Sequence, residues 1–188
     1  MKQVIMAALA VTTLMVLSIT SALSGWDPNK SETAANQNIQ DYEVQQAITD
    51  FRNNDPSMKV FFEKAYGFAI FPTVGKGGLG IGGAYGEGKV YSKDVLNGTS
   101  SLMQFTFGLQ LGGQAYREII FFKDKTAFDL FKYGNFEFGA QVSAVAATAG
   151  VSANTDYSNG VAIFTIAKSG LMFEASVGGQ KFSFEPLN

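Results

Sequence analysis

Three glutamates are the residues of this sequence best placed to do acid–base chemistry. Glu118, Glu137 and Glu174 each lie in an apolar, strand-like stretch, and two carboxyl groups that face each other can act as acid and base. Pairing with a cation such as Arg117 or Lys168, or a solvent-facing position, explains them equally well. The chain has no His and no Cys, which removes thiol nucleophiles, Ser-His-Asp triads and the usual zinc sites. We therefore expect no enzymatic activity, and a carboxylate hydrolase is a rival hypothesis.

Two glycine-rich stretches have the spacing of phosphate-binding loops. Residues 75–80 fit G-x-G-x-x-G and residues 83–89 fit G-x-x-x-x-G-K. Both motifs require a following helix, but the first continues into further glycines and the second into Val90, where Ser or Thr should hold Mg²⁺. The polar loop 154–160 lacks the ligand spacing of a calcium loop. We therefore expect a glycine-rich sheet with no cofactor and no metal site.

Cationic side chains outnumber acidic ones between residues 59 and 117. If the loops and a helix in this region come together, the cations form a positive rim beside exposed Phe side chains, an arrangement that recognises lipid headgroups. Scattered surface charge is the alternative. The candidate lipid-binding residues are Lys59, Phe61, Phe62, Lys64, Lys76, Lys89 and Arg117. The formal net charge of −2 gives no basic surface of the kind that nucleic-acid binding needs.

Helical periodicity is confined to three segments. Residues 39–51 have apolar side chains at helical spacing, and Asp55 with Pro56 can begin a second helix that runs to about residue 65. A third, short helix is expected at 124–132, where Asp124 is the cap. The residues that should face inward from it are Ala127, Leu130 and Phe131.

Strand signals dominate from Phe68 onward. The clearest two-residue period runs from Met103 to Gly112, with one apolar face and one polar or bare face. The side chains that we expect in the core are Phe105, Phe107, Phe136 and Phe138. Glycine-containing turns or loops are expected at 72–78, 86–88 and 168–170, and a hairpin is expected over 94–100, which contains Asn97-Gly98. Together these signals predict an α+β fold: a glycine-rich, curved antiparallel β-sheet or partial barrel with two N-terminal helices and one short inserted helix.

The first 24 residues have the organisation of a signal peptide. A cationic start at Lys2 precedes an apolar run from Val4 to Ile19, and small residues near Ala22 and Ser24 fit a cleavage site. The apolar run is short for a membrane span of about 20 residues, which favours a cleaved signal peptide. An uncleaved membrane anchor is the alternative. Residues 25–38 are polar and are predicted as a linker before a domain over 39–188. We expect a periplasmic or secreted protein, or one peripheral to a membrane.

Four segments, in order along the chain, resemble the SYLF domain. They are AYGFAIFPTVGKGGLGIGGAYG at 65–86, GGQAYREIIFF at 112–122, GAQVSAVA at 139–146 and GLMFEASVGGQKF at 170–182, and the resemblance covers about residues 39–187. SYLF domains of eukaryotes bind phosphoinositides and membranes, and yeast members bind actin. The resemblance therefore implies lipid binding, although an exported bacterial member would meet neither phosphoinositides nor actin.

The combined expectation is a non-enzymatic protein of the bacterial cell envelope that binds lipid or a membrane. Its partner would be a phospholipid or a membrane surface, and neither nucleic acid nor actin. The alternative is an envelope protein-interaction module, a scaffold without a lipid ligand.

Overall fold

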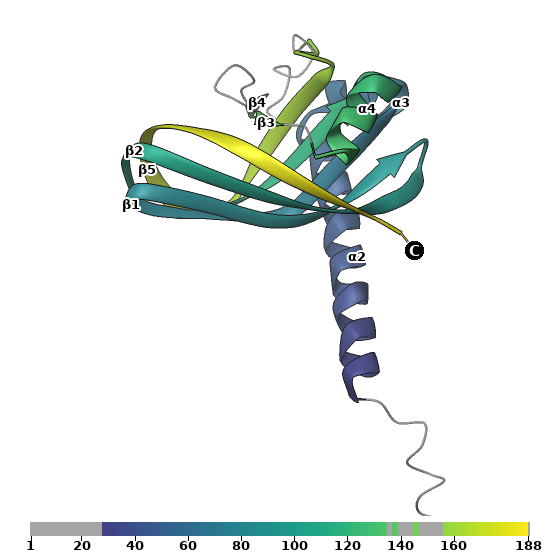
Figure 1. The fold of residues 1–188 in the computed structure, drawn as a ribbon, viewed down its shortest axis with the longest axis horizontal. Coiled ribbons are helices and arrows are strands. Elements are labelled where there is room, and N and C mark those ends of the chain that lie inside the picture. The colour runs from purple at the N-terminus through teal and green to yellow at the C-terminus, as the bar shows by residue number, and fades with distance from the viewer. Residues whose placement is uncertain (1–27, 135–136, 139–144, 147–155, 188) are drawn as a thin grey trace, which may run out of the picture. The chain divides into compact units, whose positions relative to one another are not determined.

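Three long antiparallel strands form the framework of the protein (Figure 1). The computed structural model describes residues 28–134, 137–138, 145–146 and 156–187. Strands β1 (Gly67–Ser92), β2 (Val95–Phe122) and β5 (Val161–Pro186) pair in the order β1-β2-β5. Two short strands also pair with β5: β3 (Glu137–Phe138) antiparallel and β4 (Val145–Ala146) parallel. The predicted α+β class with a curved, mainly antiparallel sheet is confirmed.

Four helical segments accompany the sheet. They are α2 (Pro28–Asn54), the 3₁₀ turn η1 (Pro56–Met58), α3 (Lys59–Lys64) and α4 (Lys125–Lys132). Helix α2 begins inside the segment predicted as a linker, and Pro28 stands at its first position, where a missing N–H is tolerated. The chain divides into two compact units, residues 1–40 and 41–188, and the sheet belongs to the second.

Both predicted helix caps are confirmed. The Asp55 side chain accepts a hydrogen bond from the Ser57 backbone N–H at 2.9 Å, and Asp124 accepts one from the Ala127 N–H at the same distance. The inward face of α4 was predicted less well. Phe128 is buried there, whereas Leu130 is exposed. Ala127 and Phe131 are buried as predicted, so the error is confined to the third inward position.

The turns predicted at the glycine-rich stretches are wrong. Strand β1 continues through residues 72–78 and 86–88, and β5 continues through 168–170. A hairpin does connect β1 and β2 at the start of the segment 94–100, with its tight turn at Lys93 and Asp94, whose φ angles are 50° and 63°. The glycines bend continuous strands where the sequence suggested that they end them.

The three-stranded ribbon folds back on itself near the middle of each strand. Glu118 lies opposite Thr165, fifteen positions along β5 from Gln180, a separation of about 50 Å on a straight strand. Nevertheless the Gln180 Nε2 donates a hydrogen bond to Glu118 Oε2 at 2.9 Å. The rings of Phe71 and Phe182 likewise come within 5.7 Å, centroid to centroid. We call the parts of the ribbon on either side of the bend its two limbs. The limbs therefore face each other across an interior.

The reversal is centred on the pair formed by Leu79 and Leu111. Gly80 and Gly112 beside them have φ angles of 76° and 118°, a region that side chains disfavour. On either side of this point the limbs of β1 approach closely, since a Cβ added at Gly88 would lie 2.4 Å from the Ile70 carbonyl oxygen. Figure 1 shows the ribbon turning at the end of the sheet that carries the labels β1, β2 and β5.

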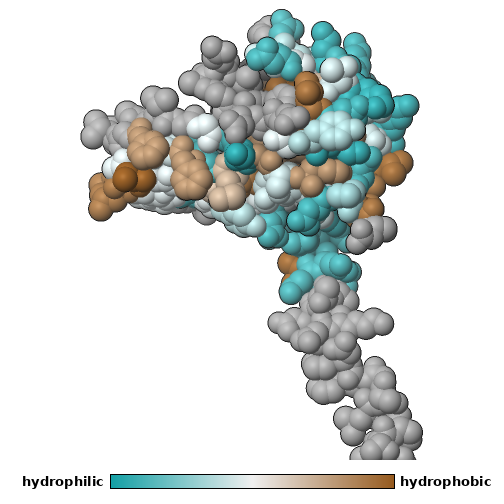
Figure 2. Space-filling view, viewed as in Figure 1, coloured by the Kyte–Doolittle hydropathy of each residue, from teal (hydrophilic) through white to brown (hydrophobic). Residues whose placement is uncertain are grey.

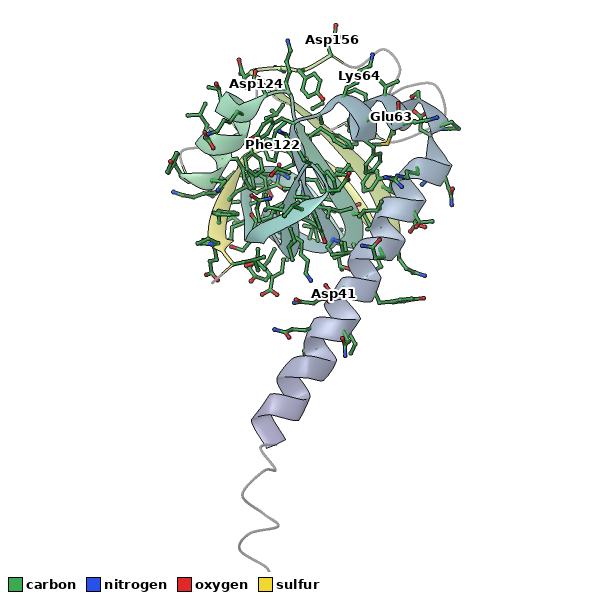
Figure 3. All side chains as sticks on the ribbon, turned by 90° about the vertical axis from the view of Figure 1, so that its right-hand side faces the viewer. Asp41, Glu63, Lys64, Phe122, Asp124 and Asp156 are labelled. Carbon is green, nitrogen blue, oxygen red and sulfur yellow. The ribbon has the colours of Figure 1, made fainter. Side chains whose placement is uncertain are left out.

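Two buried clusters stabilise the folded ribbon. The inner cluster lies between the limbs and α4, and its largest rings are Phe71, Phe122, Phe131 and Phe182. Figure 3 places Phe122 in this interior. The outer cluster joins the other face of the sheet to α2 and α3 through Phe51, Phe61, Phe121 and Phe164. Each face is thus covered near the helices.

Candidate functional site

Among the side chains that the structure describes, seven large apolar ones project into solvent around the bend of the ribbon. Their exposed fractions run from 45% to 79%, with Leu79 at the upper end. We call this set the bend surface. Its members are Leu79, Ile81, Tyr85, Met103, Phe105, Phe107 and Leu111. Figure 2 shows hydrophobic residues gathered at this end of the molecule, away from the hydrophilic region near the helices.

The register explains why these residues share one face. Leu79 lies opposite Leu111, and Ile81 lies opposite Phe107. Phe105 has a glycine on both sides, Gly83 in β1 and Gly179 in β5. Because alternate residues of a strand point to the same side, the odd-numbered residues form one convex apolar face. This face continues the one that α2 and α3 cover nearer the helices.

The prediction that Phe105 and Phe107 lie in the core is wrong. Each is 64% exposed, whereas Thr106 between them is 1% exposed. The interior of a tight bend has little room, so the smaller side chain points inward and the two rings point outward. Phe136 lies outside the described residues, and Phe138 is described only as part of β3.

Strands β1 and β2 bring almost no charge to the bend surface, while Lys181 of β5 lies opposite Met103 at its edge. None of the residues from Val95 to Tyr116 is charged, and Lys76 is the one charged residue of β1 between Phe68 and Tyr85. A contiguous exposed apolar area of this kind marks an interaction site in a soluble domain. Its chemistry fits an apolar partner.

The predicted lipid-binding residues on α3 have mixed environments. Lys59 and Lys64 are exposed, and the Lys59 Nζ lies 3.6 Å from Glu63 Oε1. Figure 3 shows Glu63 and Lys64 on α3. Phe61 is buried against Phe121 and Phe164. Its ring is part of the core and is not presented to a partner.

Phe62 is half-buried, and its ring is covered by the guanidinium group of Arg52 at 4.6 Å. Both residues line a pocket of about 590 Å³, together with Pro56, Lys59, Glu63 and Asp94. The two cations and two anions of this lining offset each other, so the pocket offers no strong preference for a charged ligand.

The remaining predicted cations pair with helix α2 or point into the ribbon. Lys89 forms an ion pair with Asp41, and the Arg117 Nη2 lies 3.1 Å from Asp50 Oδ2. Lys76 is half-buried on the inner face. The seven candidates are therefore distributed over α3, the α2-facing side of the sheet and the interior.

Among the described side chains of the interior, Glu118 is a fully buried ionisable group. Burial raises its pKa from an ordinary 4.5 to about 7, while the hydrogen bond from Gln180 and the charge of Lys76 oppose this change. Its Oε1 has no hydrogen-bond partner. Neither Gln180 nor Lys76 carries a carboxyl group, so neither can act as the second carboxyl group that a hydrolase would need. Within the described residues, no cluster of three or more metal-ligating side chains occurs.

No helix in the described part of the chain combines the length and apolar character needed to cross a membrane. The bend surface is thus an apolar feature of a sheet, and its residues alternate with glycine, threonine and glutamine.

Comparison with known proteins places this architecture in a family. Residues 103–186, which hold most of β2 and β5, match the model of the Ysc84 family, described as a Las17-binding protein actin regulator. The chain carries an SYLF domain. Domains of the SYLF type are associated with binding of lipid or actin.

A bacterial relative supports the same assignment. Beta cell expansion factor A of Aeromonas veronii is 33% identical over 138 residues, which make up 72% of this chain. The alignment covers 52% of the relative, so this chain spans about half of that protein's length. The SYLF resemblance inferred from the four sequence segments is confirmed.

Proposed function

We propose that this SYLF domain is a non-catalytic membrane-binding protein of the bacterial cell envelope, which inserts its bend surface into the lipid interface. The observation that carries the proposal is the set of seven exposed apolar side chains on one convex, nearly uncharged face. Exposure of these apolar side chains to water is unfavourable. Insertion into a bilayer interface removes this free-energy cost.

The energetics favour reversible binding. Moving one largely exposed Leu or Phe side chain out of water contributes roughly 1 to 2 kcal/mol. Several such side chains together offset the association cost of about 4 kcal/mol or more. Tyr85 fits the margin of the inserted region, because its hydroxyl donates a hydrogen bond to Glu87 Oε1 at 2.8 Å while its ring is exposed.

Charge makes a small contribution in this proposal. The chain has a formal net charge of −2, and loss of a leader containing Lys2 would leave 13 cations against 16 anions, or −3. Neither value attracts an anionic membrane. The favoured partner is therefore the apolar region of a phospholipid bilayer, whatever its headgroup charge.

Vesicle flotation tests the proposal directly. The mature protein is mixed with phosphatidylcholine vesicles, or with phosphatidylethanolamine–phosphatidylglycerol vesicles, and floated through a density gradient. We expect both kinds of vesicle to carry it, and the triple variant L79S/F105S/F107S to bind at least tenfold less. These side chains are exposed, so circular dichroism should show an unchanged fold.

A matched control removes exposed apolar residues elsewhere. Val95 is 64% exposed and Tyr133 is 77% exposed, and the variant V95S/Y133S should float like the natural protein. Failure of the natural protein to float with either kind of vesicle would refute membrane binding. Purification of an envelope protein with the domain, in the absence of vesicle binding, would instead support the protein-interaction module.

A further inference from the structure

Glu118 connects two parts of the ribbon that are far apart along the strands. It lies opposite Phe71 and Thr165, on the limb near the helices. Its hydrogen-bond partner Gln180 lies opposite Gln104, on the returning limb. This hydrogen bond therefore spans the interior between the two limbs.

The environment of Glu118 favours its neutral form. The side chain is fully buried, and its Oε1 has no hydrogen-bond partner, so an ionised carboxylate there would be poorly solvated. Lys76 of β1 is the cation whose charge acts on it. Helix α4 borders the same cluster with Lys132, whose ammonium lies over the rings of Phe128 and Phe184.

The other nearby charges belong to the opposite face of the sheet. Arg117, the neighbour of Glu118 in β2, pairs with Asp50 of α2. Lys181, the neighbour of Gln180, alternates to the outer face with Met103. The carboxyl group is thus separated from these charges by the sheet itself.

We propose that Glu118 is a proton-controlled latch of the folded ribbon: the limbs close over its neutral form, whereas burial of its ionised form, with Oε1 unsolvated, favours their separation. The hydrogen bond from Gln180 favours the ionised form and opposes this separation only in part. An opened ribbon exposes the carboxylate to water, which stabilises its charge. Opening is therefore linked to loss of the proton. Because the limbs carry the bend surface, the latch would also set how rigidly this surface is held. The importance of this rigidity for binding rests on the proposed membrane binding.

Thiol labelling of the lipid-free mature protein measures this opening, because the natural chain has no Cys. The variant Ala84→Cys places a thiol at a position that is 8% exposed and belongs to the inner cluster. Its labelling is followed at pH 5, 6, 7, 7.5 and 8, with rates corrected for ionisation of the thiol. The other variants are made in this background. The open fraction should rise roughly fiftyfold between pH 5 and pH 7.5 and then level off, as linkage between opening and ionisation of the Glu118 carboxyl group predicts. In Glu118→Gln the open fraction should not change over this range.

Two further variants make the result specific. Glu185→Gln changes an exposed carboxyl group of β5, the strand that carries Gln180, and should retain the full pH dependence. Gln180→Leu removes a donor that favours the ionised form, so the rise should extend to a higher pH than in Ala84→Cys alone. This variant also provides a test if Glu118→Gln does not fold.

A flat profile in Ala84→Cys alone, or an undiminished rise in Glu118→Gln, would overturn the latch. The measurement contains no lipid, so its outcome is independent of vesicle flotation. The two proposals can therefore fail separately.

Discussion

Glu118 shows how one buried side chain can link proton binding to stability. A carboxyl group whose pKa is higher in the folded protein than in the unfolded chain makes folding less favourable once the unfolded chain can ionise. For Glu118 the two values are about 7 and 4.5. The cost is absent below pH 4.5, grows as the pH rises through this interval, and is complete above pH 7.

Replacement of Glu118 by Gln should therefore stabilise the protein at high pH. We expect the difference in the free energy of unfolding to be on the order of 3 kcal/mol at pH 8 and close to zero at pH 4. Urea denaturation of both proteins at pH 4, 6 and 8 measures it. A constant difference at all three values would show that the carboxyl group does not titrate in this interval.

Gly88 is required by the close approach of the two limbs of β1. A Cβ at this position would lie 2.4 Å from the Ile70 oxygen and 2.7 Å from Phe71 Cδ1. We expect Gly88→Ala to lower the free energy of unfolding by about 2 kcal/mol or more, because backbone has to shift. Gly75→Ala is the matched control, since nothing lies within 4 Å of the added carbon. Equal thermal stability of the two variants would contradict the fold-back geometry.

At the scale of elements, the acidic side of α2 positions the helix on the sheet. Asp41, Glu43 and Asp50 pair with Lys89, Lys168 and Arg117, respectively. In the structure their charges are matched by cations of β1, β2 and β5.

The pair between Asp50 and Arg117 should contribute measurably to stability. Arg117 is 12% exposed and its Nε has no hydrogen-bond partner, so loss of Asp50 leaves a poorly solvated cation. Because Asp50 itself is 44% exposed, we expect Asp50→Ala to cost about 1 to 2 kcal/mol in urea denaturation. Glu63→Ala, which breaks an exposed pair with Lys59, should cost less than about 0.5 kcal/mol. Equal losses would argue against burial as the cause.

The helices could be predicted from sequence because their signals are local. Asp55 and Asp124 cap within three residues of their own positions, and apolar spacing marks the helices that follow. The fold-back could not be predicted in this way. It depends on contacts such as Glu118 with Gln180, which are 62 residues apart, and no short pattern encodes them.

For a related reason, the sequence did not predict which face of β2 is buried. Strict alternation from Met103 to Gly112 indicates two faces but does not say which of them is buried. Elsewhere the larger residues face a core, whereas here the inner side of the bend accommodates Thr106 and glycine. The absence of charge from 95 to 116 was the available signal of an apolar surface that no other element covers.

At the scale of the whole molecule, the separation of charge from the bend surface predicts how binding responds to salt. The ion pairs lie near the helices, while the bend surface is nearly uncharged. We expect partitioning onto phosphatidylcholine vesicles to change less than twofold between about 50 mM and 500 mM NaCl, because screening acts on charges and not on apolar contacts. A steep decline with salt in a flotation series would point to the exposed cations of α3 instead.

Because three strands reverse direction at one place, their lengths are mutually dependent. In β1 the segments before and after Leu79 have about the same length. The residues of β2 and β5 that pair with them are divided at the same place. Deleting a single residue between the bend and Gly88 would turn every later side chain of that limb over, so that Val90 would face water and Lys89 the interior. A change in the length of one strand therefore needs a compensating change in the facing strands or a further β-bulge, like the irregularity between Phe71 and Val74.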